Sequence, residues 1–151
     1  MGSPRLAKLC DSIELSVKDS CKDRISVSFS GGIDSTLIAF LAQKHCDVEL
    51  IAVGIPDAHD LKAARSASEL IDMELKVIEV EPKDMITEGM EMQKCLNLSS
   101  IEIEFMLPFW IAAKNSDNSI LMCGQGADEL FGGYARFRTE DAEYNLEKEV
   151  S

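Results

Sequence analysis

The sequence predicts an α/β domain built on a doubly wound parallel sheet. Strand-like and helix-like segments alternate four times along the chain, which is typical of βαβ units. Two glycine-bearing turns, at 30–35 and 124–133, each follow a strand-like segment. The length of 151 residues and the hydrophobic fraction of 46% suit one domain with its own core. We therefore treat 1–151 as a single domain and expect its ligand outside the carboxyl ends of the strands.

The first half of the chain gives two strands and three helices. Apolar residues share one helical face over 5–21, namely Leu6, Leu9, Ile13 and Val17. The β-branched and aromatic run at 25–29 predicts the first strand. A helix with an acidic first turn is expected over 34–45. A second strand at 49–53 and a third helix at 60–71 complete the alternation in this half.

The second half repeats the pattern with longer helices. A strand is expected at 75–80, followed by a helix over 82–95 whose first residue is a proline. A further helix is expected over 100–115, with a local disturbance near Pro108. The last strand is expected at 119–123 and leads through glycines into a short helix. Two aromatic residues of this half, Phe109 and Trp110, are expected in the core.

Charge and cysteine content limit the possible partners. The chain carries 27 acidic and 15 basic residues, for a net charge of −12, whereas nucleic-acid binders neutralise phosphates with Lys and Arg. The net charge alone does not exclude a local patch of basic residues. The five cysteines include no CxxC pair, and no apolar run reaches 18 residues, so we expect a cytoplasmic protein without a disulfide framework or membrane span. The acidic end of the chain, 140–151, suggests a solvated helix or a frayed tail.

The first motif is the turn Ser30-Gly31-Gly32-Ile33-Asp34-Ser35 between a strand and a helix. Glycines bring backbone N–H groups close to a ligand, and the helix that follows presents free N–H groups, so the turn suits a phosphate. It is not a Walker A loop, because no lysine follows the glycines. The alternative is a plain strand-to-helix turn in which Asp34 is the N-cap.

These residues resemble a known family. The turn is similar to the SGGxDS signature of PP-loop ATP pyrophosphatases, which implies an adenine nucleotide α-hydrolase-like fold and cleavage of ATP between its α- and β-phosphates. The segment 124–134, GQGADELFGGY, resembles the GEGxDELFGGY element of asparagine synthetase and β-lactam synthetase at ten of eleven places. The stretches 52–56 and 60–64 also resemble that family, so the likeness covers roughly 20–138.

The resemblance implies a site, position by position. The pyrophosphate-binding loop corresponds to Ser30, Gly31, Gly32, Asp34 and Ser35. The adenosine is framed by the positions of Phe29, Val53, Cys123 and Gly124. Asp34 and Asp128 match two carboxylates that hold Mg²⁺ in the family, and hard oxygen ligands suit this ion. For Asp128 the alternative is a helix cap after glycine. An acidic chain also repels ATP, so a bridging cation is expected on charge alone.

Three departures from the family pattern matter. Gln125 stands where the relatives have Glu, and an amide cannot act as a general base for amide formation. The segment 98–108 contains Glu102 and Glu104 but no basic residue to meet a carboxylate substrate. The sequence also continues for only 17 residues after Tyr134, so we expect it to lack the further helical region and the amino-terminal glutaminase domain of the synthetases.

The resulting hypothesis is an ATP-dependent, AMP-forming ligase domain that activates a carboxylate or similar group for amide formation. Asp34, Asp128 and Gln125 are its candidate catalytic residues, ATP and Mg²⁺ its cofactors, and an unknown small molecule its acceptor. Two alternatives remain: a tRNA-modifying PP-loop enzyme, and a non-catalytic or partner-dependent nucleotide-binding module. We also expect a homo-oligomer or a partner chain, because apolar surface that is covered in longer relatives would otherwise face water.

Overall fold

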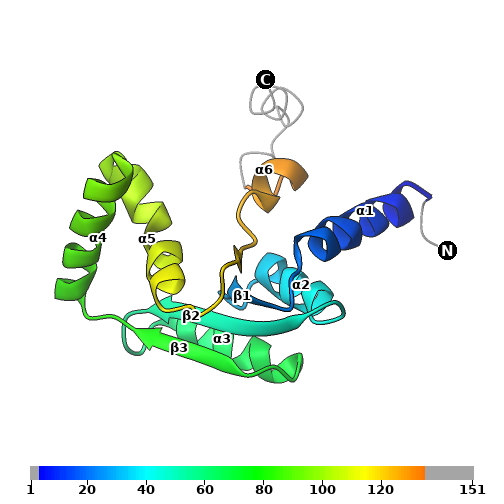
Figure 1. Cartoon of the computed structure of the whole chain (residues 1–151), viewed down its shortest axis with the longest axis horizontal. Coiled ribbons are helices and arrows are strands. Elements are labelled where there is room, and N and C mark those ends of the chain that lie inside the picture. The colour runs from blue at the N-terminus through cyan, green and yellow to red at the C-terminus, as the bar shows by residue number, and fades with distance from the viewer. Residues whose placement is uncertain (1–3, 135–151) are drawn as a thin grey trace.

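Four parallel strands form one sheet in the computed structural model, which describes residues 4–134 (Figure 1). The strands are β1 (Arg24–Ser28), β2 (Asp47–Gly54), β3 (Leu75–Glu79) and β4 (Leu121–Met122). The helices are α1 (Pro4–Ser20), α2 (Ile33–Ala42), α3 (His59–Leu70), α4 (Pro82–Leu96), α5 (Ser100–Lys114) and α6 (Ala127–Phe131). The predicted α/β class and parallel sheet are confirmed, with each expected strand and helix of the described part present.

The strand order is β3-β2-β1-β4, so the first strand of the chain lies inside the sheet. From β1 the chain runs outward through β2 to β3, and it then returns to place β4 on the opposite side of β1. In the registers, Ser28 pairs with Ile51 of β2, and Val27 pairs with Met122 of β4. Because the order reverses between β1 and β4, a crevice is expected at the carboxyl ends of these two strands.

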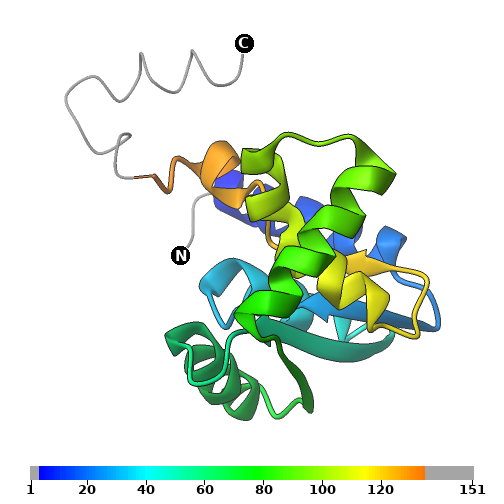
Figure 2. The same cartoon turned by 90° about the vertical axis from the view of Figure 1, so that its left-hand side faces the viewer.

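Helices cover both faces of the sheet (Figures 1 and 2). The helix α3 contacts β2 and β3, whereas α5 contacts β1 and β2 and carries α4 against its outer side. β1 is covered on both faces, since Ile25 and Val27 on one face are fully buried in the main core and Ser26 on the other face is fully buried as well. A smaller cluster of Val80, Leu107 and Ile111 joins α5 to the sheet.

A buried polar network ties the amino-terminal side of the sheet together. Ser26 of β1 has no exposed surface, and its hydroxyl donates to Oε2 of Glu49 on β2 at 2.8 Å. The same hydroxyl lies 2.7 Å from the hydroxyl of Ser116 and accepts a hydrogen bond from Nδ2 of Asn118 at 2.9 Å. The hydroxyl of Ser26 is therefore hydrogen-bonded to three side chains, and these bonds offset the free-energy cost of burying it.

Two elements differ from their sequence-based expectations. β4 pairs over only two residues rather than over 119–123, although the backbone N–H of Ser26 also donates to the carbonyl of Ile120 at 2.9 Å. Helix α5 continues through Pro108, although a proline removes one backbone hydrogen bond, and the buried neighbours Leu107 and Ile111 hold it against the sheet. The predicted acidic tail at 140–151 lies outside the described residues.

No single helix in the described part of the chain is long and apolar enough to cross a membrane, and α4 and α5 pass that test only as a pair bent by 106°. Each helix of that pair buries at least one side chain within the fold, namely Met92 of α4 and Ala112 of α5. Leu107 and Ile111 of α5 pack on Val80 at the end of β3.

Candidate functional site

The two glycine turns meet at the switch point between β1 and β4. A Cβ on Gly124 would lie 2.8 Å from the Cβ of Asp34 and 2.8 Å from the backbone nitrogen of Ser35. Real Cβ atoms do not approach other atoms so closely, so only glycine allows the second turn to contact the start of α2. Segments about ninety residues apart in sequence thus form one site.

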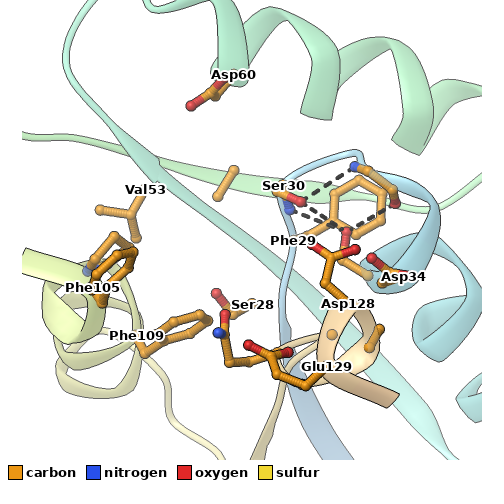
Figure 3. Close-up of a pocket in the computed structure, with 18 of the residues that line it drawn as sticks. Ser28, Phe29, Ser30, Asp34, Val53, Asp60, Phe105, Phe109, Asp128 and Glu129 are labelled. Carbon is orange, nitrogen blue, oxygen red and sulfur yellow. Dashed lines mark hydrogen bonds between the residues drawn. The ribbon is translucent and has the colours of Figure 1, made fainter. Parts of the chain in front are cut away.

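The first turn is held closed by its own serines (Figure 3). The backbone N–H of Ser30 donates to Oγ of Ser35 at 3.3 Å, and Oγ of Ser35 donates to the carbonyl of Gly32 at 3.2 Å. The Gly32 N–H donates to Oγ of Ser30 at 3.3 Å. These contacts shape the loop from within, which is typical of short serine turns.

Helix α2 starts directly after this loop without a side-chain cap. Its N-cap is Gly32, and no side chain accepts a hydrogen bond from its first turn. The alternative in which Asp34 is the N-cap is therefore wrong, because Asp34 lies inside the first turn. The first N–H groups of the helix and the positive end of its dipole are left for a ligand, as in many phosphate sites.

Gly31 contacts helix α3 rather than the cavity. Its φ of 76° is in the left-handed region, and a Cβ would lie 2.6 Å from the carbonyl oxygen of Ala63 on α3. The loop therefore packs backbone against backbone on α3. Gly31 is not among the residues that line the cavity described next, so its contribution is to place the loop rather than to face the cavity.

A cavity of about 430 Å³ opens between the turns. Nine of the predicted site residues line it: Phe29, Ser30, Gly32, Asp34, Ser35, Val53, Gly124, Gln125 and Asp128. Two do not, namely Gly31 and the exposed Cys123. The structure thus brings together residues from the carboxyl ends of β1, β2 and β4, although their part in ligand binding stays a prediction.

Asp128 is the second residue of α6, whose N-cap is Gly126 without a side-chain cap bond. Asp128 is therefore not a helix cap, and that alternative is wrong. Its carboxylate lies over the glycine pair that ends the helix, where a Cβ on Gly133 would lie 1.9 Å from Oδ1 of Asp128. The second glycine of this pair thus leaves room for the carboxylate beside the cavity (Figure 3).

The charge of the cavity is negative. Four carboxylates line it, from Asp34, Asp60, Asp128 and Glu129, and none of its described lining residues is Lys or Arg. A phosphate-bearing ligand would therefore need the N-terminus of α2 and a cation as counter-charges. No group of three His, Cys, Asp or Glu side chains suited to a metal occurs in the described part. Two carboxylates nevertheless fit Mg²⁺, which commonly binds one or two carboxylates plus phosphate oxygens and water.

Sequence reasoning missed the aromatic wall opposite the loop. Phe105 and Phe109 of α5 line the cavity, and Phe109, expected in the core, is only half-buried there (Figure 3). Trp110 is half-buried too, but packs on the smaller core cluster and donates its Nε1–H to Oε2 of Glu88 at 2.9 Å. The spacing of four between the two phenylalanines places both on one helix face, and this signal was available in the sequence.

Comparison with known proteins agrees with this geometry. The family model for asparagine synthase matches residues 8–150, nearly the whole chain. The chain belongs to the asparagine synthase family. A putative glutamine-hydrolysing asparagine synthetase from Methanocaldococcus jannaschii is 33% identical over 135 residues, which are 85% of this chain and 25% of that protein. The chain thus spans about a quarter of this relative.

Solved structures of two synthetases share this fold. NMN synthetase from Francisella tularensis superposes with a TM-score of 0.56 and 18% identity, covering 89% of this chain and 60% of that one. An NH3-dependent NAD synthetase from Campylobacter jejuni gives a TM-score of 0.53 and 22% identity, covering 85% and 58%. The predicted PP-loop fold is therefore confirmed.

Proposed function

We propose that this domain binds ATP with Mg²⁺ in the 430 Å³ cavity and works as the activating half of an AMP-forming ligase. The observation that carries the proposal is the meeting of the two glycine turns at the switch point, with Asp34 and Asp128 beside an uncapped helix N-terminus. Membership of the asparagine synthase family supports the same reaction class.

Each part of the cavity has a role in this proposal. The N–H groups at the start of α2 and the hydroxyls of Ser30 and Ser35 bind the β- and γ-phosphates. The rings of Phe105 and Phe109 give the adenosine an apolar surface. Asp34 and Asp128 hold the cation, and Mg²⁺ so placed offsets the charge that develops on the departing pyrophosphate.

The proposed reaction has two steps. A carboxylate oxygen of the acceptor attacks the α-phosphorus, the bond from this phosphorus to the bridging oxygen of the β-phosphate breaks, and pyrophosphate leaves. A nitrogen nucleophile then attacks the activated carbonyl carbon, AMP leaves, and the nitrogen gives up a proton. The domain contributes mainly position and electrostatic stabilisation to the first step.

Gln125 separates the two steps in this proposal. It lines the cavity, but its amide cannot take the proton that the attacking nitrogen releases. The first step does not need such a base, so we expect the domain to form an adenylate more readily than an amide. The competing idea is that Gln125 only donates a hydrogen bond to substrate or backbone.

The proposal is tested by the metal dependence of nucleotide binding. Asp34→Asn and Asp128→Asn should each weaken ATP binding at least about tenfold in Mg²⁺, and much less in EDTA, since a charged ligand to the ion is lost. Asp11→Asn, an exposed change on α1, is the control. Titration calorimetry measures both conditions, and equal losses with and without Mg²⁺ would remove the metal assignment.

The reaction class is tested by its products. Any turnover should release AMP and pyrophosphate, which chromatography separates from ADP and phosphate. ADP as the main nucleotide product would contradict the proposed reaction.

A further inference from the structure

A second pocket of about 710 Å³ opens beside the nucleotide cavity. It is lined by Leu96, Leu98, Glu102, Phe105, Met106, Gln125, Glu129 and Tyr134. Four of these residues also line the first cavity: Phe105, Gln125, Glu129 and Tyr134. We call this second pocket the acceptor pocket. A molecule in it lies next to whatever occupies the nucleotide cavity, with Gln125 at the boundary.

The walls of the acceptor pocket combine apolar surface with negative charge. Leu96, Leu98 and Met106 give an aliphatic side, and Phe105 and Tyr134 add two aromatic rings. The charged residues of the lining are the carboxylates Glu102 and Glu129, and no Lys or Arg lines the pocket within the residues that the structure describes. Such walls favour an apolar body with a cationic group, which both carboxylates and aromatic faces attract.

Both carboxylates are fixed by hydrogen bonds. Oε2 of Glu102 accepts from the backbone N–H of Ser99 at 2.8 Å and from its hydroxyl at 2.6 Å, in the capping box that starts α5. These bonds hold the pKa of Glu102 below its usual range, so it is ionised at neutral pH. Glu129 accepts a hydrogen bond from the hydroxyl of Tyr134 at 2.5 Å. Both carboxylates are thus held at defined positions.

We propose that the acceptor of this domain is an apolar monocarboxylic acid that carries a protonated amine. The inference rests on the proposed function, because it places the acceptor carboxylate at the Gln125 boundary, beside the α-phosphate. The ammonium group then faces Glu102, and the hydrocarbon body lies against the leucine and aromatic walls. A dicarboxylate is disfavoured, because its second carboxylate would meet the like charge of Glu102, and the described lining residues include no basic partner.

The charge of Glu102 can be removed without disturbing the helix. Glutamine at the same position of a capping box makes the same reciprocal hydrogen bonds, so Glu102→Gln retains the start of α5. Glu102 lines only the acceptor pocket, and this variant therefore spares the nucleotide cavity. Glu104→Gln is the matched control, since Glu104 is an exposed residue of the same helix that lines neither pocket.

The experiment compares three probes on the 151-residue chain by ligand-observed NMR titration without nucleotide: phenylalanine, 3-phenylpropanoate and aspartate. Phenylalanine should bind tightest. In Glu102→Gln its advantage over 3-phenylpropanoate, which lacks only the amine, should fall by about two- to fivefold, the range of a partly exposed ion pair. Glu104→Gln should leave this ratio unchanged.

Three results would overturn the inference: aspartate binding as tightly as phenylalanine, an unchanged ratio in Glu102→Gln, or no binding by any of the three probes. ATP binding is measured in a separate titration of the same samples. Loss of the nucleotide result alone would remove the proposed function but leave the amine preference standing, whereas ATP binding with an aspartate preference would remove only the inference.

Discussion

The two sides of the nucleotide cavity are built in different ways. On one side the backbone sets the shape, because Gly31 packs against α3 and Gly124 packs against α2 at distances that exclude a Cβ. On the other side α5 and α6 present side chains, among them Phe105, which is 70% exposed, and the half-buried Phe109. Close backbone contacts fix the shape of the first side. The shape of the second side depends on which side chains α5 and α6 carry.

This difference separates two kinds of function. A phosphate group is the same in every nucleotide, so a fixed backbone turn suits it. An acceptor differs from one ligase to another, so replaceable side chains suit it, such as Phe105 and Gln125, which line both the nucleotide cavity and the acceptor pocket. We therefore expect substitutions of Gly31 and Gly124 to destabilise the whole domain. Substitutions on α5 and at Gln125 should instead change which acceptor binds or which step of the reaction proceeds.

The largest effect is expected from Gly31→Ala. The new Cβ meets the Ala63 carbonyl at 2.6 Å in a left-handed conformation, so unfolding free energy should fall by about 2–4 kcal/mol. The control is Gly89→Ala on α4, where the nearest atom is at an ordinary 3.4 Å, and which should be neutral or up to about 1 kcal/mol stabilising. Urea unfolding measures both, and equal stability of the two variants would show that the loop tolerates displacement.

The next effect concerns Gln125→Glu at the boundary of the two pockets. If the missing base limits the second step, amide formation should rise at least about tenfold, a small part of the usual worth of a general base. Pyrophosphate exchange, which reports the first step, should stay nearly constant. A neutral or harmful result in turnover would retire the missing-base idea, since a new carboxylate beside Asp128 and the phosphates adds repulsion.

A smaller effect is expected from Ser99→Ala at the start of α5. The variant removes the hydroxyl that accepts from the Glu102 backbone N–H, so unfolding free energy should fall by about 1 kcal/mol. Ser99→Thr should retain most of it, because threonine also caps. Because the cap also fixes Glu102, the alanine variant should lower phenylalanine binding as well. Stability loss without any change in binding would separate the cap from the pocket.

The smallest effect is a pH dependence on the outer side of α5. Hydrogen bonds from Lys114 and then Trp110 hold the pKa of Glu88 below the ordinary 4.5, with burial opposing them. A lowered folded-state pKa stabilises above the unfolded value, and this stability is lost as pH falls through the folded pKa. Wild type should therefore exceed Glu88→Gln in stability at pH 7, and the difference should shrink below about pH 4.5. A constant difference from pH 7 to 3 would contradict this.

The backbone-built side of the site was predictable because its signals are local. The glycines of 30–35 and 124–133 mark both turns, and the alternation of elements places them at the carboxyl ends of strands. The parallel sheet follows from the same alternation. The strand order, which brings β4 beside β1, follows from no local signal, since it depends on how the α4–α5 hairpin packs.

The side-chain wall was largely missed for a physical reason. Phe109 and Trp110 are adjacent in α5, and an apolar residue in a helix is equally compatible with a core position and with a cavity lining. The sequence therefore does not tell which of the two roles Phe109 has. Cys123 was expected at the adenosine but is exposed outside the lining. Assembly into oligomers and location in the cytoplasm stay predictions, as does the binding role of each site residue.

The short pairing of β4 has a consequence for the order of folding. The helices and loops between β3 and β4 span 80–120, and closing so long a segment costs more entropy than the shorter connections that join β1, β2 and β3. β4 pairs with β1 through two residues, with help from the Ser26 network. We therefore expect the first turn to form with its local strands and the second to be placed only when the last strand docks. If the cavity is completed by that docking, ligand binding there reports that both ends of the sheet have assembled.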